Sequence, residues 1–172
     1  MDAELRRMAV FGVHVDSEVG EVMLLLVLDE PSTGEEELVV PVSIGPREGA
    51  AIASVQAGIV PPRPQTHDLA LDLLHAAGGS LLQVEIVKLL GGVFFAELVL
   101  GSGRRVDART SDAVALALRA SVPILCHPGV LDAAGVQGGP WIAARVDSEG
   151  ELAEFREFLE SVEPEDFDDQ DS

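Results

Sequence analysis

The fold is decided by residues 80–100, which read SLLQVEIVKLLGGVFFAELVL. Two runs of β-branched, leucine and aromatic residues flank Gly91-Gly92, and a glycine pair between two such runs is typical of a tight β-hairpin. A second turn, GSG at 101–103, leads to a short strand around RRVDA at 104–108. This region therefore predicts three antiparallel strands.

Three more strands are expected earlier in the chain. Residues 8–15, 21–28 and 37–44 read MAVFGVHV, EVMLLLVL and ELVVPVSI, and the turn-rich segments SEVG and PSTGEE separate them. The simplest arrangement is an antiparallel meander. A further short strand is compatible with PILC at 123–126.

Three main helices are interspersed with these strands. The first is expected at REGAAIASVQA, 47–57, which ends at Gly58. The second follows the proline-rich segment 61–64, with Thr66 as its N-cap and an apolar stripe that includes Leu69 and Leu73. The third is TSDAVALALRA at 110–120, before Pro123. The pattern predicts an α+β domain with a mixed, mainly antiparallel sheet.

Length and charge indicate one domain and a tail. The 172 residues carry 47% hydrophobic side chains and a net charge of −19. Residues 147–172 hold twelve acids and one arginine, so they contribute −11 and the rest of the chain −8. We expect a domain over 1–135 and an acidic extension over 136–172, with a short amphipathic helix at about 151–162 followed by a disordered tail.

The same features bear on the setting of the protein. The longest apolar run, VMLLLVL at 22–28, is too short to span a bilayer, and the first ten residues carry acids in place of an apolar signal core. Cys126 is the single cysteine, which agrees with a reducing compartment. We therefore expect a cytoplasmic protein that does not associate with membranes. The acidic charge disfavours polyanion binding overall but allows it locally.

The starts of the second and third helices are alike. Arg63 precedes Thr66-His67-Asp68, and Arg109 precedes Thr110-Ser111-Asp112. The simpler interpretation is capping, since a first-turn Asp stabilises a helix by about 0.3–1 kcal/mol and a hydroxyl satisfies free amides. The functional interpretation is a phosphate site, because a helix N-terminus and an arginine both attract anions.

Several side chains near these helix starts could carry chemistry. A histidine such as His67 can exchange a proton near neutral pH, which suits a general acid or base. Carboxylates are the ligands that Mg²⁺ and Mn²⁺ prefer, provided that several of them converge. The carboxylate candidates are Glu48, Asp68, Asp107 and Asp112. No phosphate-binding loop of the GxxxxGK[ST] type, GxGxxG, HExxH or GxSxG motif occurs in the chain.

The sequence resembles the bifunctional nuclease family over roughly residues 8–132. The resemblance is carried by PVSIGPREGAAIA at 41–53, PPRPQTHDL at 61–69, GGVFFAELVL at 91–100 and VDARTSDAVALALR at 106–119. It implies an α+β fold, self-association as a dimer or higher oligomer, and hydrolysis of both RNA and DNA. It directs attention to eight residues: Glu48, Arg63, His67, Asp68, Asp107, Arg109, Ser111 and Asp112.

The leading hypothesis is a nuclease assisted by Mg²⁺ or Mn²⁺. Phosphate would be bound by Arg63, Arg109, Ser111 and Thr66. Catalysis would rest on His67, Asp68, Asp107 and Asp112, and the metal ion on Asp68, Asp107, Asp112 and Glu48. Two alternatives stay open: a non-catalytic oligomer that holds a small phosphorylated ligand, and a structural subunit whose acidic tail contacts a basic partner.

Overall fold

The computed structural model describes residues 4–16, 20–29 and 38–138, which form one mixed sheet with helices packed against it. The first three strands are β1 (Arg6–Asp16), β2 (Glu21–Leu28) and β3 (Leu38–Ile44), and they pair antiparallel in that order. The predicted hairpin is β4 (Leu81–Leu90) and β5 (Val93–Leu100), and β6 (Arg105–Arg109) pairs antiparallel with β5. The α+β class is confirmed.

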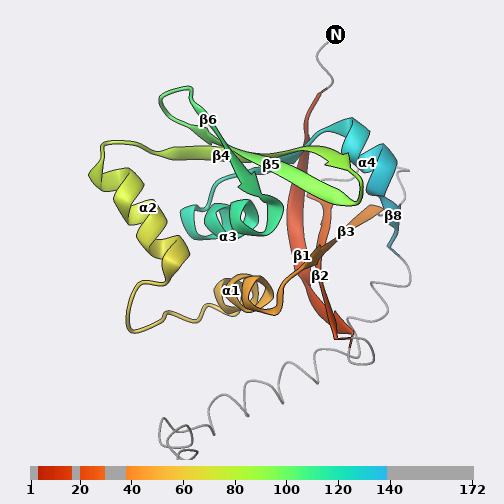
Figure 1. Cartoon of the computed structure of the whole chain (residues 1–172), viewed down its shortest axis with the longest axis horizontal. Coiled ribbons are helices and arrows are strands. Elements are labelled where there is room, and N and C mark those ends of the chain that lie inside the picture. Colours follow the sequence, from red (N-terminus) through yellow and green to blue (C-terminus); the bar gives the residue numbers. More distant parts are fainter. Residues whose placement is uncertain (1–3, 17–19, 30–37, 139–172) are drawn as a thin grey trace, which may run out of the picture. The chain divides into compact units, whose positions relative to one another are not determined.

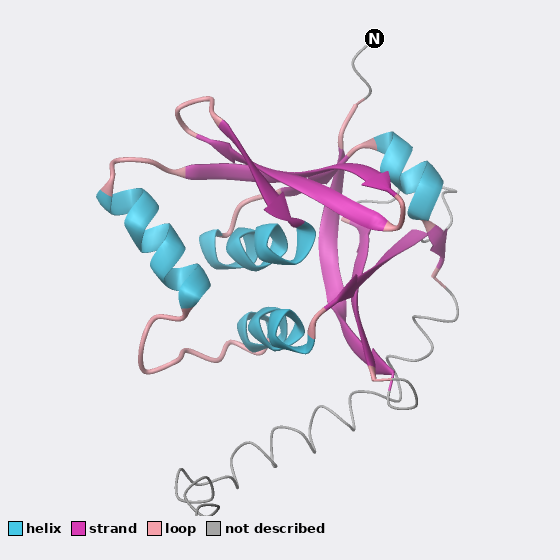
Figure 2. Ribbon diagram, viewed as in Figure 1, coloured by secondary structure: helices cyan, strands magenta, loops and turns pink. Residues whose placement is uncertain are grey.

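The two strand groups are joined by the short strand β7 (Ile124–Cys126). Its partners are β1, in antiparallel orientation, and β4, in parallel orientation, so the sheet order is β6-β5-β4-β7-β1-β2-β3-β8. A purely antiparallel meander would lack this β4–β7 pair. Figure 2 shows the consequence: the β4–β5 hairpin runs across the strands β1, β2 and β3 at a steep angle, as expected for a twisted sheet.

Two helices fill the concave side of this sheet (Figure 1). Helix α1 (Pro46–Gln56) packs on β1 and β2, and α3 (Thr110–Ala120) packs on α1, β4, β5 and β6. Seven residues of α3 are buried, because its many alanines allow close approach. The core therefore depends on α3, which starts directly where β6 ends.

Helix α2 (Thr66–Ala76) is held more loosely than the sequence pattern suggests. It packs mainly against α3, and Leu71 is its one buried residue. Leu69 and Leu73, which belong to the expected apolar stripe, are exposed. Figure 1 shows the reason: α2 lies at the outer end of the helical layer, so a single side of it meets the domain.

One helix and one strand were not expected from the sequence. Helix α4 (Pro128–Ala134) buries Val130 and Leu131 against the core, and β8 (Val136–Gln137) pairs with Leu38 and Val39 of β3. Seven residues give too short a periodic pattern for a helix prediction, and the glycines that follow resemble a linker. Gly138 ends the described part of this region.

The acidic extension lies almost wholly outside the described residues, including the helix expected at about 151–162. The compact unit of the described domain extends to Gln137. No helix in residues 4–16, 20–29 or 38–138 is long and apolar enough to cross a membrane. Cys126 is fully buried, and burial raises the pKa of its thiol to about 12, so the group stays protonated at neutral pH.

The packing of α1 can be tested at Gly49. A Cβ there would lie 2.8 Å from Val22 Cγ1 and 3.2 Å from Val13 Cγ1, so Gly49→Ala forces two core side chains to move. We expect urea unfolding to show a net loss of about 1–2 kcal/mol, after the better helix propensity of alanine is counted.

The matched control is Gly129→Ala in α4, where a Cβ meets no heavy atom within 4 Å. This variant should be as stable as the wild type or slightly more stable. Equal unfolding midpoints for all three proteins would contradict the described contact of α1 with β1 and β2.

Candidate active site

The starts of α2 and α3 lie side by side. His67 Nε2 is 3.2 Å from Asp112 Oδ1, although 45 positions separate the two residues in the chain. A carboxylate can only accept, so Nε2 is the donor in this contact, and in the neutral imidazole the lone pair then lies on Nδ1. The His67 side chain is 17% exposed and that of Asp112 31% exposed. The pair therefore lies near the surface with one imidazole nitrogen available for chemistry.

Arg109 holds the other side of the Asp112 carboxylate. Its Nε donates to Asp112 Oδ2 at 2.7 Å and its Nη2 to Asp112 Oδ1 at 3.1 Å, which is a forked contact. Its Nη1 donates to Glu48 Oε1 in α1 at 3.0 Å. Because β6 passes directly into α3, Arg109 combines an extended backbone with a position one residue before the helix. Three helices thus contribute to one polar cluster: Glu48, His67, Arg109 and Asp112.

Electrostatics keep Asp112 ionised. Burial, the largest single effect, would raise the pKa of its carboxyl group, but hydrogen bonds from Arg109 and His67 and attraction to both groups together outweigh burial and lower the pKa. Hydrogen bonding and attraction to Asp112, together with a hydrogen bond to Glu48, raise the pKa of Arg109 above its already high usual value. At neutral pH the cluster therefore contains a fixed carboxylate that can orient the His67 ring.

Thr66 was expected to be the N-cap of α2, and this prediction is wrong, whereas α3 starts at Thr110 as predicted. The N-caps are Gln65 and Arg109, and each threonine is the first residue of its helix. At α2 the cause is Asp68, whose Oδ2 accepts from the Gln65 backbone N–H at 2.8 Å and so sets the N-cap three residues upstream. At α3 the cause is the absence of any loop after β6, which leaves the extended Arg109 as N-cap.

Asp68 also faces α3, but it contacts Arg119 and not the His67–Asp112 pair. Its Oδ1 accepts from Arg119 Nε at 2.9 Å, so its carboxylate is engaged by a guanidinium and by the Gln65 amide. The buried Ser111 lies in the first turn of α3, and the exposed Thr66 in that of α2. The buried Thr110 hydroxyl has no hydrogen-bond partner among the described residues.

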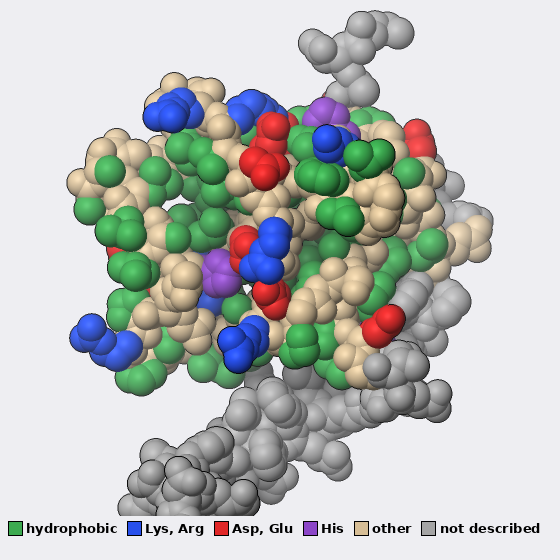
Figure 3. Space-filling model, in the orientation of Figure 1, with side chains coloured by type: hydrophobic (Ala, Val, Ile, Leu, Met, Phe, Trp, Pro, Cys, Tyr) green, Lys and Arg blue, Asp and Glu red, His purple; other side chains and the backbone are tan. Residues whose placement is uncertain are grey.

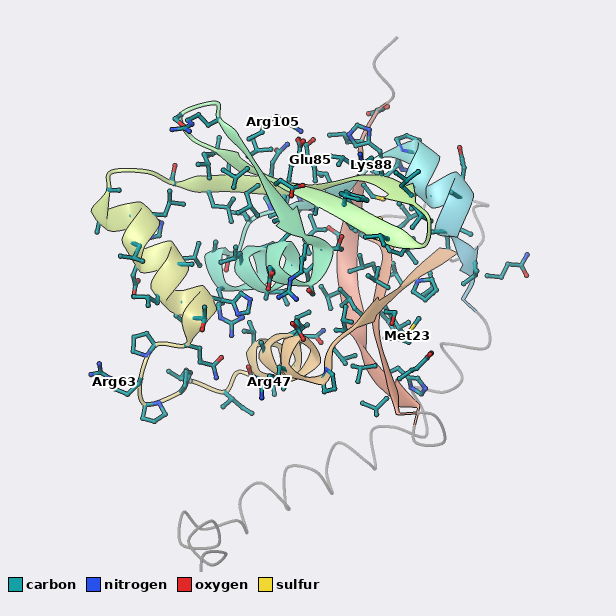
Figure 4. The ribbon with its side chains drawn as sticks, in the orientation of Figure 1. Met23, Arg47, Arg63, Glu85, Lys88 and Arg105 are labelled. Carbon is teal, nitrogen blue, oxygen red and sulfur yellow. The ribbon has the colours of Figure 1, made fainter. Side chains whose placement is uncertain are left out.

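Asp107 and Arg63 are not brought into the cluster. Asp107 stands opposite Glu97 in the β5–β6 pair, and no hydrogen bond or ion pair of the described residues includes its side chain. Figure 4 shows Arg63 on the loop before α2, with its side chain directed outward from the domain. Arg105 and Glu85 lie on the far side of the sheet from this loop. Of the two predicted phosphate-binding arginines, the structure thus brings Arg109 alone beside His67.

The four carboxylates do not surround a common point. Among the described residues, no three His, Cys, Asp or Glu side chains are close enough to share a metal ion. Asp112 and Glu48 are bound by Arg109, and Asp68 is bound by Arg119. A divalent ion would have to displace guanidinium groups from these oxygens. This arrangement does not fit a Mg²⁺ or Mn²⁺ site, and the metal stays a prediction from the sequence.

A hollow of about 400 Å³ lies beside α2. Apolar residues of α1 and the following loop form one wall, and polar residues of α2 and α3 form the other. Its lining comprises Val55, Gly58, Ile59, Val60, Pro61, Pro64, Asp68, Asp72 and Arg119. His67 and Asp112 are not part of this lining. The candidate catalytic pair therefore lies outside this hollow.

Charge on this face of the domain is mixed. Figure 3 shows Lys and Arg side chains separated by acidic and apolar ones, with no continuous basic stripe. A polyanion would therefore be attracted at points, and not along a groove. This distribution agrees with the sequence expectation that attraction for anions is local.

Two polar groups escaped the sequence prediction. Arg119 is a single charged residue at the end of the apolar helix α3, and Glu85 is a single acid within the apolar strand β4. Both are buried or nearly so, and Arg105 pairs with Glu85 and Glu97 across the strands. The available signal was the same for both: a lone charge in a run that is otherwise buried requires a partner.

Comparisons with known proteins agree with this fold and these motifs. The family model described as the bifunctional nuclease domain matches residues 26–138. Two proteins of Mycobacterium tuberculosis, from strains CDC 1551 / Oshkosh and ATCC 25618 / H37Rv, are each 43% identical over 161 residues. These alignments cover 92% of this chain and 95% of each relative, and both relatives are described as uncharacterized.

The charge on Asp112 should contribute to stability. Its folded pKa is lowered, so the contribution is present above the ordinary carboxyl pKa of about 4 and is lost as pH falls through the folded value. We expect Asp112→Asn to lower the free energy of unfolding by about 1 kcal/mol at pH 7 and equally at pH 5, and by less at pH 3.

Urea unfolding at pH 7, 5 and 3 measures this difference, and Asp132→Asn on the exposed side of α4 is the control. A gap between Asp112→Asn and wild type that is the same at pH 3 as at pH 7 would show that the carboxylate charge is not the cause.

Proposed function

Because the chain belongs to the bifunctional nuclease domain family, we propose that it hydrolyses phosphodiester bonds in RNA, DNA or both. The observation that carries the proposal is the 3.2 Å contact between His67 Nε2 and Asp112 Oδ1. An imidazole oriented by a carboxylate through one nitrogen is suited to general base catalysis through the other. Without this contact, the helix starts would support capping alone.

The proposed step begins with a water molecule beside His67. Nδ1 of His67 accepts a proton from the water while the water oxygen attacks phosphorus. Asp112 stabilises the imidazolium that forms. The new P–O bond replaces the bond to the leaving oxygen, which receives the proton from the imidazolium or from solvent. Charge and atoms balance without any further reactant.

Arg109 is the proposed phosphate-binding group. Its side chain is 67% exposed, and its three contacts with Asp112 and Glu48 use three of its five N–H donors. The two remaining donors can meet phosphate oxygens next to His67, and the start of α3 adds positive potential. Mg²⁺ or Mn²⁺, expected from the sequence, has no part in this step, and Asp107 and Arg63 are not needed for it.

Two observations favour the alternative function of a non-catalytic protein that holds a small phosphorylated ligand. The net charge of −19 and the mixed surface in Figure 3 repel a polymer more than a single phosphate group. The same Arg109 and α3 start would then bind the ligand. Stabilisation by a nucleoside monophosphate in a thermal-shift assay, without cleavage of any polymer, would favour this alternative.

The proposal is tested with purified wild type, His67→Gln and Asp112→Asn on end-labelled RNA and DNA, each in Mg²⁺, Mn²⁺ and EDTA. We expect His67→Gln to lose about 10²- to 10⁴-fold in cleavage rate, because it removes the general base. Asp112→Asn should lose less, since the ring remains but is no longer oriented.

The matched control is His75→Gln, which removes an exposed histidine from the other end of the same helix. It should cleave at the wild-type rate. Equal cleavage by wild type and His67→Gln would mean that the activity belongs to a contaminant or to another site, and would contradict the proposal.

A further inference from the structure

Arg119 is a buried cation that anchors the start of α2. Its side chain is 7% exposed, although it lies in the last turn of α3. A guanidinium removed from water is costly unless its donors are bound, so its contacts are expected to be specific. Those contacts reach three helices.

Two contacts of Arg119 fix the N-cap region of α2. Nε donates to Asp68 Oδ1 at 2.9 Å, and Nη2 donates to Gln65 Oε1 at 3.0 Å. Asp68 in turn accepts from the Gln65 backbone N–H through its other oxygen at 2.8 Å. His67 lies between these two residues in the chain. The guanidinium therefore binds a side chain on each side of His67 in the chain.

The remaining contacts tie the guanidinium to the rigid part of the domain. Nη2 also donates to the Ala51 carbonyl of α1 at 3.2 Å, and Nη1 donates to the Ala115 carbonyl of α3 at 3.1 Å. The backbone carbonyls of two packed helices thus fix where Arg119 lies. Arg119 therefore sets the position of the start of α2 relative to α1 and α3.

Apolar packing alone does not fix the position of α2. Leu71 is the one buried residue of α2, while Leu69 and Leu73 face solvent. Leu74 adds a partly buried contact with the core, but α2 still buries less apolar surface than α3, so polar contacts have a larger share in setting its position. The contact of His67 with α3 depends on that position.

We infer that Arg119 is a positioning residue: it fixes the start of α2 so that His67 meets Asp112. This inference rests on the proposed function for its catalytic meaning. Arg119→Lys keeps the positive charge but loses the forked guanidinium, so it can form only some of the hydrogen bonds of Arg119. Arg119→Met keeps an apolar side chain of similar length and forms none of these hydrogen bonds.

The experiment compares ¹⁵N-labelled wild type, Arg119→Lys, Arg119→Met and Gln65→Ala, with Arg104→Met as control. Arg104 is an exposed arginine in the turn between β5 and β6, so its loss changes net charge as Arg119→Met does. The measurement is the pair of ring ¹⁵N resonances of His67, assigned with His67→Gln. These resonances report which nitrogen holds the proton and whether it is hydrogen-bonded.

We expect Arg119→Met to move both His67 resonances away from the Nε2-protonated, hydrogen-bonded form, and Arg119→Lys to move them part of the way. Gln65→Ala, which removes one exposed acceptor, should move them least, and Arg104→Met should leave them unchanged. In the cleavage assay, Arg119→Met should lower kcat by up to about 10²-fold with a smaller change in KM, because a displaced base acts poorly on bound substrate.

Unchanged His67 resonances in folded Arg119→Met would overturn the inference. If that variant does not fold, unchanged resonances in both Arg119→Lys and Gln65→Ala would overturn it equally. A wild-type protein that cleaves neither RNA nor DNA contradicts the proposed function, while the resonances still decide whether Arg119 positions His67. The two failures are therefore separate observations.

Discussion

The candidate site depends on one carboxylate that accepts from two directions. Asp112 receives the forked guanidinium of Arg109 from the end of β6 and the imidazole of His67 from the start of α2. Burial alone would favour its neutral form, and these donors reverse that preference. Because Arg109 also binds Glu48 of α1, the same carboxylate indirectly connects α1, α2 and α3.

The fold explains why these groups meet at this place. Strand β6 ends against the core and continues without a loop into α3, so Arg109 and Asp112 have fixed positions three residues apart. Helix α2, by contrast, lies at the outer end of the layer and has few buried side chains. The candidate pair spans these two helices, so one partner lies on the well-packed α3 and the other on α2, which has fewer buried side chains. Hydrogen bonds from Arg119 to Asp68 and Gln65 hold the start of α2, where apolar packing is limited.

Local signals in the sequence predicted most of the fold. The Gly91-Gly92 hairpin, the helix at 110–120 and the first three strands follow from turn residues and periodicity within short windows. The parallel β4–β7 pair was not predicted, because it joins strands that are far apart in the chain. Helix α4 was missed because seven residues contain too little periodicity. The nuclease family was predicted from its motifs, and the family match confirms it. For the candidate site, the sequence predicted which residues belong to it but not which contacts they make. The likeness between the two helix starts points to His67, Arg109 and Asp112 from the sequence alone. Neither spacing nor composition could tell that Asp68 turns toward Arg119 or that Arg63 points outward from the domain. The same holds for Asp107, which stands opposite Glu97 in the β5–β6 pair. Partners 45 or 51 positions apart are chosen by tertiary packing, which short windows do not contain.

The central claim is that His67 and Asp112 act as one unit on a phosphodiester. A double-mutant cycle tests it most directly. The single-turnover cleavage rate is measured for wild type, each single variant and the combined His67→Gln/Asp112→Asn protein. If Asp112 acts through His67, the combined variant should be no slower than His67→Gln alone. If the two losses multiply in the combined variant, the residues act independently and the account is contradicted.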